Sequence, residues 1–449
     1  MHDLIIIKYE FTPTPTRSHV NAYAAALMSA AREYIAAHGV QEALAAAVCE
    51  VLRTRPADPI LGIRDILLAM EASKSSAKMA VPPSEEPMKL PPVSTIAPVI
   101  DVSSWLNDPS SVEAQTACKA LAESLKATGI ALLRDSRVSE ADEVAFLDLM
   151  EDYFAQPDEL KMADVRKEFH YQVGATPSMV EIPICKTDAE CIERIEGMPS
   201  EHKPLPISGP DPKWRFFWRI GERPKEVSGY EDLNAAPVHP AAFPRWGETM
   251  DRWGHLMLAS VSTCAEMAAV GFGLPSNAIT SLMEHGPHLL APTGSDLGKH
   301  HEVNTILAGF HNDLNLLTIH GKSRYPGLHV WLRDGTKRRV AIPNGCLLVQ
   351  AGMQMERLTG GQVIAGMHEV VVLPETVEVA ERRAAAGRPP WRISSTLFAH
   401  VASTKELRPL GDFATDEALR LYPPTTAGEQ VLSVLRKINL ADPSKARSY

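Results

Sequence analysis

The segment HNDLNLLTIH, which starts at residue 311, contains a histidine and an aspartate two positions apart, followed by an apolar run. Side chains two positions apart on a β-strand point to the same face, so His311 and Asp313 can reach one point. His368 lies 55 residues after Asp313, far enough to belong to another strand. Two histidines and one carboxylate suit non-haem Fe(II), which keeps three coordination positions open. In a chain with 16 histidines, one such tripeptide also arises by chance.

A second histidine–carboxylate pair has the same spacing. His300 and Glu302 occur in the segment GKHHEV, and a glutamate can also bind iron. This pair lacks the apolar strand pattern that follows Asp313, so we favour His311 and Asp313. The remaining histidines of this region and one tryptophan are expected to pack in the interior or to line a cleft: His320, His329, His400 and Trp331.

Short β-type runs surround the candidate ligands, and Gly, Pro, Asn and Asp separate them. The runs are 304–310, 314–319, 327–332, 338–342, 346–350, 363–373 and 392–401. Strands that follow one another in this way suit a sandwich or jelly roll. The pattern therefore predicts a mainly β domain with flanking helices, in which separate strands position the three ligands.

The composition limits the classes of partner. The net charge of -10 and the pI of about 5.9 argue against a general nucleic-acid or anionic-membrane binder, which needs clustered Lys and Arg. The six cysteines show no CxxC spacing, so we expect neither a zinc ribbon nor a disulfide framework, and a reducing compartment. No apolar run reaches the ~18 residues of a membrane span. We expect a cytoplasmic protein.

The first part of the chain differs from the rest. Residues 18–71 are Ala-rich and helical in pattern, and residues 72–97 are rich in Ser, Pro and Lys, as in an extended tether. Two apolar stripes at helical spacing include Leu44, Val48, Ile60, Ile63 and Leu67. Two such short helices cannot bury their apolar faces alone. They either pack on the main domain or form a four-helix bundle with a second copy.

Several motifs occur in the order of one family. They are APVIDVSSWL (97–106), ATGIALLRD (127–135), FAQPDELKM (154–162), HNDLNLLTIHGKSRYPGLHVWL (311–332), VAIPNGCLLVQAGMQMERLTGG (340–361), IAGMHEV (364–370) and RISSTLF (392–398). On these motifs, residues 98 to about 405 resemble the isopenicillin N synthase-like 2-oxoglutarate/Fe(II) oxygenases. The resemblance implies a double-stranded β-helix (jelly roll) and the use of Fe(II), 2-oxoglutarate and O2.

The resemblance also assigns residues. It implies that His311, Asp313 and His368 bind Fe(II), and that Arg392 and Ser394 hold the distal carboxylate of 2-oxoglutarate. A guanidinium can pair with a carboxylate through two parallel hydrogen bonds. Two departures stand out. The family's Asn-Tyr-Tyr-Pro segment is replaced by LLAPTGSDLGKHHEVN, which has no tyrosine, and a long insertion separates His368 from Arg392.

The family acts on small molecules, and two segments of this chain are candidates to line the substrate cleft. FHYQVGATPSMVEIP (169–183) and WRFFWRIGERP (214–224) contribute Tyr171, Arg215, Phe217 and Arg219. Aromatic residues at this spacing also form ordinary core. If the arginines do face the cleft, they favour a substrate that carries a carboxylate.

The segment LRTRPADPILGIRDILLAM (52–70) resembles the dimerisation and docking domain of the type II regulatory subunit of cAMP-dependent protein kinase. That family has an Arg-Pro-x-Asp-Pro connector before a helix that starts with Ile. The resemblance implies a homodimer whose surface receives an amphipathic helix from an anchoring protein. It also suggests a ciliary or other cytoskeletal location.

These observations predict five parts. They are a helical dimerisation and docking module (1–71), a linker (72–97), the N-terminal part of the oxygenase (98–230), its jelly-roll core (231–405) and a helical tail (406–449). Three functions remain open: a 2-oxoglutarate-dependent dioxygenase acting on a small molecule, an iron oxidase that does not use 2-oxoglutarate, and a catalytically silent scaffold subunit.

The two apolar stripes generate a first prediction. Leu67→Asp should dissociate the full-length homodimer, because an unpaired buried carboxylate costs several kcal/mol. Sedimentation at micromolar concentration measures the change, and a chain that begins at Pro98 should be a monomer that still binds iron. If the native chain and the variant both sediment as monomers, the docking interpretation fails.

Overall fold

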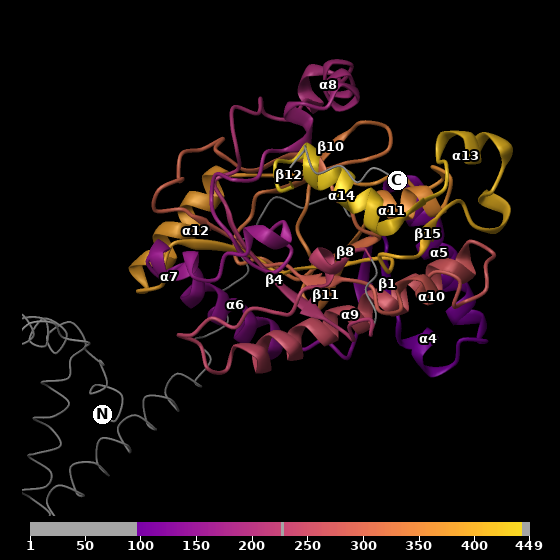
Figure 1. The fold of residues 1–449 in the computed structure, drawn as a ribbon, viewed down its shortest axis with the longest axis horizontal. Coiled ribbons are helices and arrows are strands. Elements are labelled where there is room, and N and C mark those ends of the chain that lie inside the picture. Colours follow the sequence, from indigo (N-terminus) through magenta and orange to yellow (C-terminus); the bar gives the residue numbers. More distant parts are fainter. Residues whose placement is uncertain (1–96, 226–228, 442–449) are drawn as a thin grey trace, which may run out of the picture. The chain divides into compact units, whose positions relative to one another are not determined.

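Two β-sheets form the framework of the protein, and helices pack around them (Figure 1). The computed structural model describes residues 97–225 and 229–441. The larger sheet has ten strands in the order β1-β2-β11-β8-β14-β5-β4-β6-β13, with β3 paired to β4. The smaller sheet has four strands in the order β10-β9-β12-β7.

The strands of the larger sheet are β1 (Val99–Asp101), β2 (Ile130–Arg134), β3 (Gly174–Thr176), β4 (Trp214–Ile220), β5 (His288–Leu290), β6 (Thr293–Asp296), β8 (Leu317–His320), β11 (Cys346–Ala351), β13 (Trp391–Ser394) and β14 (Thr396–Ala399). Those of the smaller sheet are β7 (Ile306–Asn312), β9 (Leu328–Trp331), β10 (Lys337–Arg339) and β12 (Met367–Val371). A separate pair is formed by β15 (Glu406–Leu407) and β16 (Thr425–Thr426).

The α-helices are α4 (Ser103–Asn107), α5 (Val112–Thr128), α6 (Glu140–Phe154), α7 (Asp158–Met162), α8 (Ala189–Glu196), α9 (Trp246–Gly271), α10 (Thr280–Met283), α11 (Met353–Leu358), α12 (Pro374–Ala385), α13 (Asp416–Leu421) and α14 (Ala427–Lys437). Ser111 caps the N-terminus of α5, where its hydroxyl accepts a hydrogen bond from the N–H of Ala114. Gly129 caps the C-terminus with a φ of 73°, which suits glycine.

Helix α9 packs against one face of the larger sheet and fixes which side chains of β4 face the interior of the roll. Trp246 and Trp253 of α9 share one apolar core with alternate residues of β4. These are Trp214, Phe216, Trp218 and Ile220. The residues between them, Arg215, Phe217 and Arg219, therefore point to the opposite face of the sheet.

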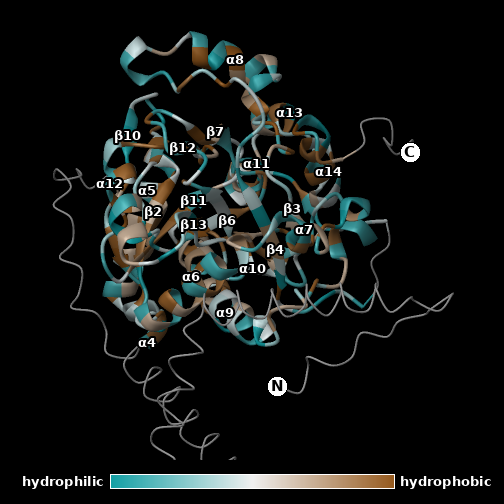
Figure 2. Ribbon diagram, turned by 90° about the vertical axis from the view of Figure 1, so that its left-hand side faces the viewer, coloured by the Kyte–Doolittle hydropathy of each residue, from teal (hydrophilic) through white to brown (hydrophobic). Residues whose placement is uncertain are grey.

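The outer face of the smaller sheet is covered by the segment that contains α8, which lies beyond β7 and β12 in Figure 2. Phe310, Trp331 and Met367, from three strands of this sheet, pack with Ile184 and Met198 on either side of α8. Because side chains alternate along β7, burial of Phe310 on this face turns His311 to the other.

One expectation about cysteine is corrected. The structure joins Cys185 and Cys191 in a disulfide, with Cα atoms 5.0 Å apart, although the sequence predicted no disulfide framework. The chain turns back into α8 between them, where the Asp188 carboxylate accepts a hydrogen bond from the N–H of Cys191. The free cysteines of the described ranges are buried: Cys118, Cys264 and Cys346.

The predicted run 392–401 is wrong as a single strand. The structure divides it at Ser395 into β13, which pairs with β6, and β14, which pairs with β8 and β5. The Ser395 hydroxyl accepts a hydrogen bond of 2.8 Å from the indole N–H of Trp253, which ties the break to α9. A strand propensity cannot reveal this contact with a distant helix.

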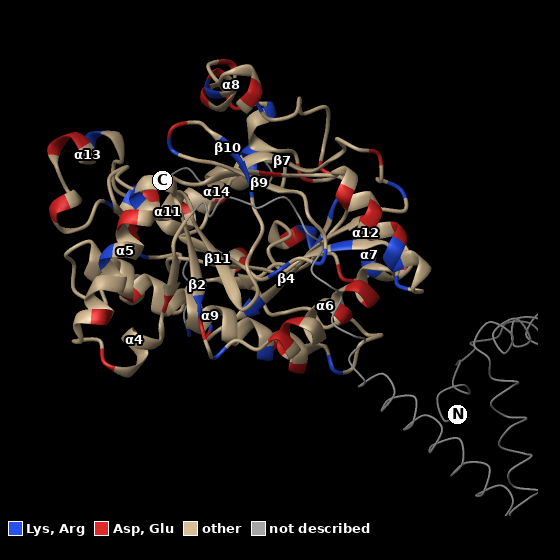
Figure 3. Cartoon of the chain, turned by 180° about the vertical axis from the view of Figure 1, so that it is seen from behind, with Lys and Arg blue, Asp and Glu red and all other residues tan. Residues whose placement is uncertain are grey.

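The long insertion between His368 and Arg392 contains helix α12. Arg383 of α12 and Arg388 after it pair with Glu151 of α6 at 2.8 and 2.6 Å. Arg324 adds a third contact to the same carboxylate at 2.7 Å. Figure 3 shows charges of both signs on α12. The network holds the long insertion on α6, so that the chain enters β13 at a fixed place.

The predicted parts 98–230 and 231–405 share one sheet, because β2 pairs with β11, and β4 pairs with β5 and β6. The predicted module 1–71 and all but the last residue of the linker 72–97 lie outside the described residues. Their dimer and docking residues stay predictions. Within the described ranges, no helix is both long and apolar enough to cross a membrane.

Glu151 generates a second prediction. Glu151→Ala should lower the free energy of unfolding by about 3–5 kcal/mol, because its three buried or half-buried arginines lose their common counter-charge. Asp148→Ala is the matched control: this side chain is 47% exposed and pairs with Arg324 and Arg388, so its loss should cost about 1 kcal/mol or less. Urea unfolding measures both. Equal losses would contradict the structural role of Glu151.

Candidate metal centre

The pairing of β7 and β12 brings the two candidate histidines together. His311 and His368 are directly opposite each other in the antiparallel register, and their ring centroids are 4.2 Å apart. Neighbouring residues of two paired strands point to the same face of the sheet. The two imidazoles therefore meet on the inner face of the smaller sheet, as the alternation of β7 requires.

Asp313 completes the group. It follows the last residue of β7, and its Oδ1 lies 3.9 Å from Nε2 of His311. One ligand atom from each of His311, Asp313 and His368 lies within 4.8 Å of the others, and no other such group occurs in the part of the chain that the structure describes. Asp313 and His368 are buried. The structure thus assembles the predicted triad.

A layer of hydrogen bonds orients these side chains. Nδ1 of His311 donates to the carbonyl of Gly309 at 2.5 Å, and His368 is hydrogen-bonded to the carbonyl of Gly366. The Thr318 hydroxyl donates to Oδ2 of Asp313 at 2.6 Å. Such contacts fix the ring orientation of metal-binding histidines and raise metal affinity. They leave Nε2 of His311 and Oδ1 of Asp313 directed at each other.

The protonation states suit a divalent metal. Burial, followed by the charge of His311, lowers the pKa of His368 to about 4, and burial with the charge of Lys213 lowers that of His311. Burial alone would raise the pKa of Asp313, but His368, His311 and the Thr318 hydrogen bond outweigh it and keep this pKa low. Near neutral pH the site offers two neutral imidazoles and one carboxylate, as metal binding requires.

Arg392 lies on β13 of the larger sheet and is 6% exposed. Its Nε donates to the carbonyl of Pro326 at 3.4 Å, and no carboxylate of the described residues pairs with it. Burial lowers its pKa to about 10, so the group remains charged. A buried cation without a counter-charge is costly, and an anionic ligand would remove that cost.

Ser394, two residues further along β13, is already engaged. Its hydroxyl accepts from the N–H of Thr293 at 3.1 Å and is hydrogen-bonded to the Thr293 hydroxyl at 2.6 Å. The register aligns Ser394 with Thr293 and Arg392 with Ser295. Arg392 and Ser394 therefore share one face of β13. The Ser394 hydroxyl has a hydrogen-bond partner in Thr293, whereas the charge of Arg392 has no carboxylate partner among the described residues.

Buried polar side chains lie between Arg392 and the triad. The charges of both Asp313 and Arg392 act on His320, whose side chain interacts with that of Gln350. Nε2 of Gln350 lies 3.2 Å from Nδ1 of His368. These side chains connect the triad to Arg392.

The cleft candidates occupy two places. Arg215, Phe217 and Arg219 share the inner face of β4, and the Arg215 guanidinium lies over the Phe217 ring at 4.2 Å. Arg215 is paired with Glu181 at 2.5 Å. Tyr171, in contrast, lies in an apolar cluster with Tyr230 and residues of α14.

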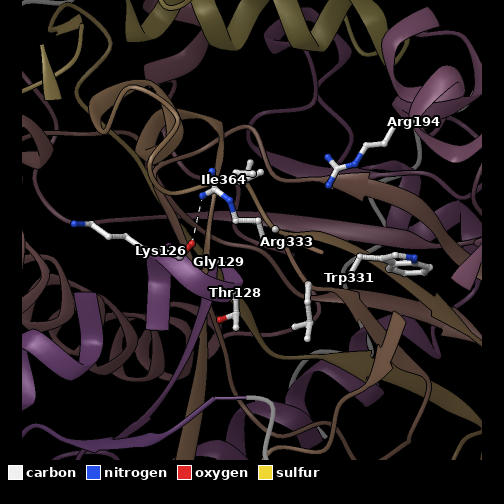
Figure 4. A pocket seen from close by; sticks show the side chains of 10 residues that line it. Lys126, Thr128, Gly129, Arg194, Trp331, Arg333 and Ile364 are labelled. Atoms are coloured by element: carbon white, nitrogen blue, oxygen red, sulfur yellow. Dashed lines mark hydrogen bonds between the residues drawn. The ribbon is translucent and has the colours of Figure 1, made fainter. Parts of the chain in front are cut away.

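The rival pair His300 and Glu302 and a surface pocket both lie outside the metal centre. His300 and Glu302 are in the connection between β6 and β7 and belong to no metal-binding group within the described ranges. A shallow pocket between α5, α8 and the smaller sheet is shown in Figure 4. Its Arg333 donates to the carbonyls of Lys126 and Gln362, so this guanidinium is already engaged by the backbone.

Solved structures with this fold are oxygenases. A protein of the 2OG-Fe(II) oxygenase family from Caulobacter crescentus has a TM-score of 0.58 and 23% identity, over 76% of this chain and 98% of that chain. A full-length Neurospora crassa protein in complex with alpha-KG, that is 2-oxoglutarate, and thymine has a TM-score of 0.58 and 18% identity, over 76% and 96%. The rice dioxygenase for auxin oxidation has 0.51 and 16%, over 76% and 94%.

No family model and no curated protein sequence matches the chain. At identities of 16–23%, the similarity to these structures establishes the fold. The jelly roll expected from the sequence is therefore confirmed. The site residues rest on the geometry described above.

Sequence reasoning missed three residues that shape the site. Thr318 and Gln350 are on strands that read as apolar runs, and only the pairing of β8 with β11 shows that both face the triad. Tyr325 is 3% exposed, and its phenol interacts electrostatically with both Arg392 and Arg383. Its position in SRYPGL gave no periodic signal.

Thr318 generates a third prediction. Thr318→Val should weaken metal binding about tenfold, because Asp313 loses the hydrogen bond that orients it. The matched control is Thr396→Val, since the Thr396 hydroxyl contacts His320 and no ligand of the triad. Calorimetric titration with Mn(II), a divalent ion that stays reduced in air, gives both affinities. Unchanged affinity in Thr318→Val would show that Asp313 needs no such support.

Proposed function

We propose that the protein is a non-haem Fe(II) and 2-oxoglutarate-dependent dioxygenase that oxidises a small molecule. The observation that carries the proposal is the triad of His311, Asp313 and His368 facing a buried, uncompensated Arg392. Two imidazoles and one carboxylate fit Fe(II) and keep three coordination positions open. A guanidinium fits the distal carboxylate of 2-oxoglutarate.

Each residue then has a defined task. His311, Asp313 and His368 would hold Fe(II), Arg392 would bind the distal carboxylate, and His320 and Gln350 would be polar neighbours of the bound groups. Iron and 2-oxoglutarate, when bound, supply the chemistry by which O2 oxidises a substrate while succinate and CO2 are released. The protein orients the reactants and keeps water out of a buried site.

Tyr325 is the proposed replacement for the tyrosine that the family carries before its metal-binding motif. Its buried phenol lies near both Arg392 and Arg383. A phenol at this place can donate to the carboxylate that Arg392 binds.

Two other functions compete with the dioxygenase. An iron oxidase that does not use 2-oxoglutarate would need the triad but would leave Arg392 buried without a counter-charge. A silent scaffold would have no chemical use for neutral histidines beside an ionised aspartate. Succinate formation separates the first of these from the dioxygenase, and metal binding separates the second.

We also propose, from the sequence of residues 40–70 alone, that the chain dimerises and accepts an amphipathic helix of an anchoring protein. This part would tether the oxygenase to a cytoplasmic assembly of ciliary or other cytoskeletal kind. The sedimentation experiment on Leu67→Asp tests its physical basis.

An anaerobic titration tests the catalytic proposal. Fe(II) and 2-oxoglutarate together should produce a metal-to-ligand charge-transfer absorption in the native protein. Asp313→Ala should abolish it, because a two-ligand site loses Fe(II). Stoichiometric iron binding by Asp313→Ala would rule out the triad.

Arg392→Ala should keep iron but weaken 2-oxoglutarate binding by about 10- to 100-fold, the value of a charged hydrogen bond. Arg388→Ala is the matched control, since Arg388 lies four positions earlier and pairs with Glu151. The same absorption, titrated with 2-oxoglutarate, gives both affinities. If Arg392→Ala binds 2-oxoglutarate as the native chain does, another cation holds the acid.

A further inference from the structure

A second buried arginine also lacks a counter-charge. Arg219 is 7% exposed, and its polar partners are the side-chain oxygen of Asn234 at 2.8 Å and the carbonyl of His285 at 3.3 Å. Its Nε has no hydrogen bond, and no carboxylate of the described residues pairs with it. Arg215, on the same face of the same strand, is neutralised by Glu181. Arg219 therefore lacks the carboxylate partner that Arg215 has.

The strand register places Arg219 on the same inner face as the metal centre. Thr318 pairs with Phe398, Phe398 with Leu289, and Leu289 with Arg219, so the four residues form one row across β8, β14, β5 and β4. Thr318 contacts Asp313 directly. Strands lie ~4.8 Å apart, so the backbones of Thr318 and Arg219 are separated by about 14 Å.

His400 lies between the two ends of the row. It follows β14, is 2% exposed, and its Nδ1 is unpaired. The charges of Arg219 and Asp313 both act on it. Its backbone N–H donates to Nδ1 of His288, which fixes its place beside β5. The unpaired Nδ1 of His400 thus lies in the region between Arg219 and the triad.

An apolar wall separates Arg219 from the metal ligands. Phe217, Leu289, Ala291 and Phe398 form one buried cluster on this face. The rings of Phe217 and Phe398 meet edge to face, with centroids 6.0 Å apart. The interior therefore offers a cation without a carboxylate partner, an apolar surface and the metal centre, in this order.

We propose that Arg219 binds the carboxylate of the primary substrate, a monocarboxylic acid with an apolar or aromatic body that extends over the Phe217 and Phe398 cluster toward the triad. This inference rests on the proposed function and adds the class of substrate. The direct hydrogen-bond partners of Arg219 are neutral, and its guanidinium can pair with a carboxylate through two parallel hydrogen bonds. The charge of Arg223, which donates to the carbonyl of the same Asn234, also acts on Arg219 and adds to the attraction for an anion. The neutral partners of Arg219 orient the group and leave its charge to the ligand.

Ligand binding at the loaded, anaerobic site tests the inference. The probes are 3-phenylpropionate and its neutral analogue 3-phenylpropanamide, added to protein with Fe(II) and 2-oxoglutarate, and calorimetry gives each affinity. The native protein should bind the acid at least tenfold more tightly than the amide. Arg219→Gln should lose this preference, and Arg219→Lys should retain part of it, because the charge remains.

Arg215→Gln serves as the matched control and should keep the preference, since the charge of Arg215 is already balanced by Glu181. Equal affinity of the native protein for acid and amide would overturn the inference, as would a preference that survives in Arg219→Gln. Loss of the charge-transfer absorption in Arg219→Gln and Arg219→Lys would instead assign Arg219 to 2-oxoglutarate. Absence of that absorption in the native protein would refute the proposed function itself, so the two failures are distinguishable.

Discussion

The site depends on the register between β7 and β12. Because His311 and His368 are direct partners in an antiparallel pair, a slip of one residue would turn one imidazole to the outer face. Burial of Phe310 and Met367 beneath the segment around α8 opposes such a slip. The apolar cover on the outside of the smaller sheet thus fixes the position of the polar groups on its inside.

Uncompensated charge is the second feature that organises the interior. Most buried cations of the described residues near the sheets are paired with a carboxylate, as Lys213 is with Asp211 and Glu181. Arg219 and Arg392 have hydrogen bonds to neutral groups but no carboxylate partner among the described residues. Leaving a buried charge unpaired lowers stability, and it is retained where a ligand of opposite charge completes the site. Both arginines are on the larger sheet, whereas all three metal ligands come from the smaller sheet or its end.

The sequence indicated the site better than its surroundings. Spacing alone suggested His311 and Asp313, and the family motifs supplied His368, Arg392 and the jelly roll. The break at Ser395, the Cys185–Cys191 disulfide and the roles of Thr318 and Gln350 were not foreseen. Each depends on a contact between segments far apart in the chain or on a local turn. Periodicity reports which face a residue takes, but it does not report the partner on that face.

The strand order of the larger sheet has a consequence for how the chain reaches this structure. Strand β2 ends at residue 134, yet it pairs with β11, which begins at residue 346. Pairing of such distant segments raises contact order and slows folding. During synthesis, β2 can pair with β1 on one edge, but its other edge must wait for β11, which also carries Gln350 beside His368. The metal centre can therefore acquire its final geometry only late, after nearly the whole jelly roll has left the ribosome.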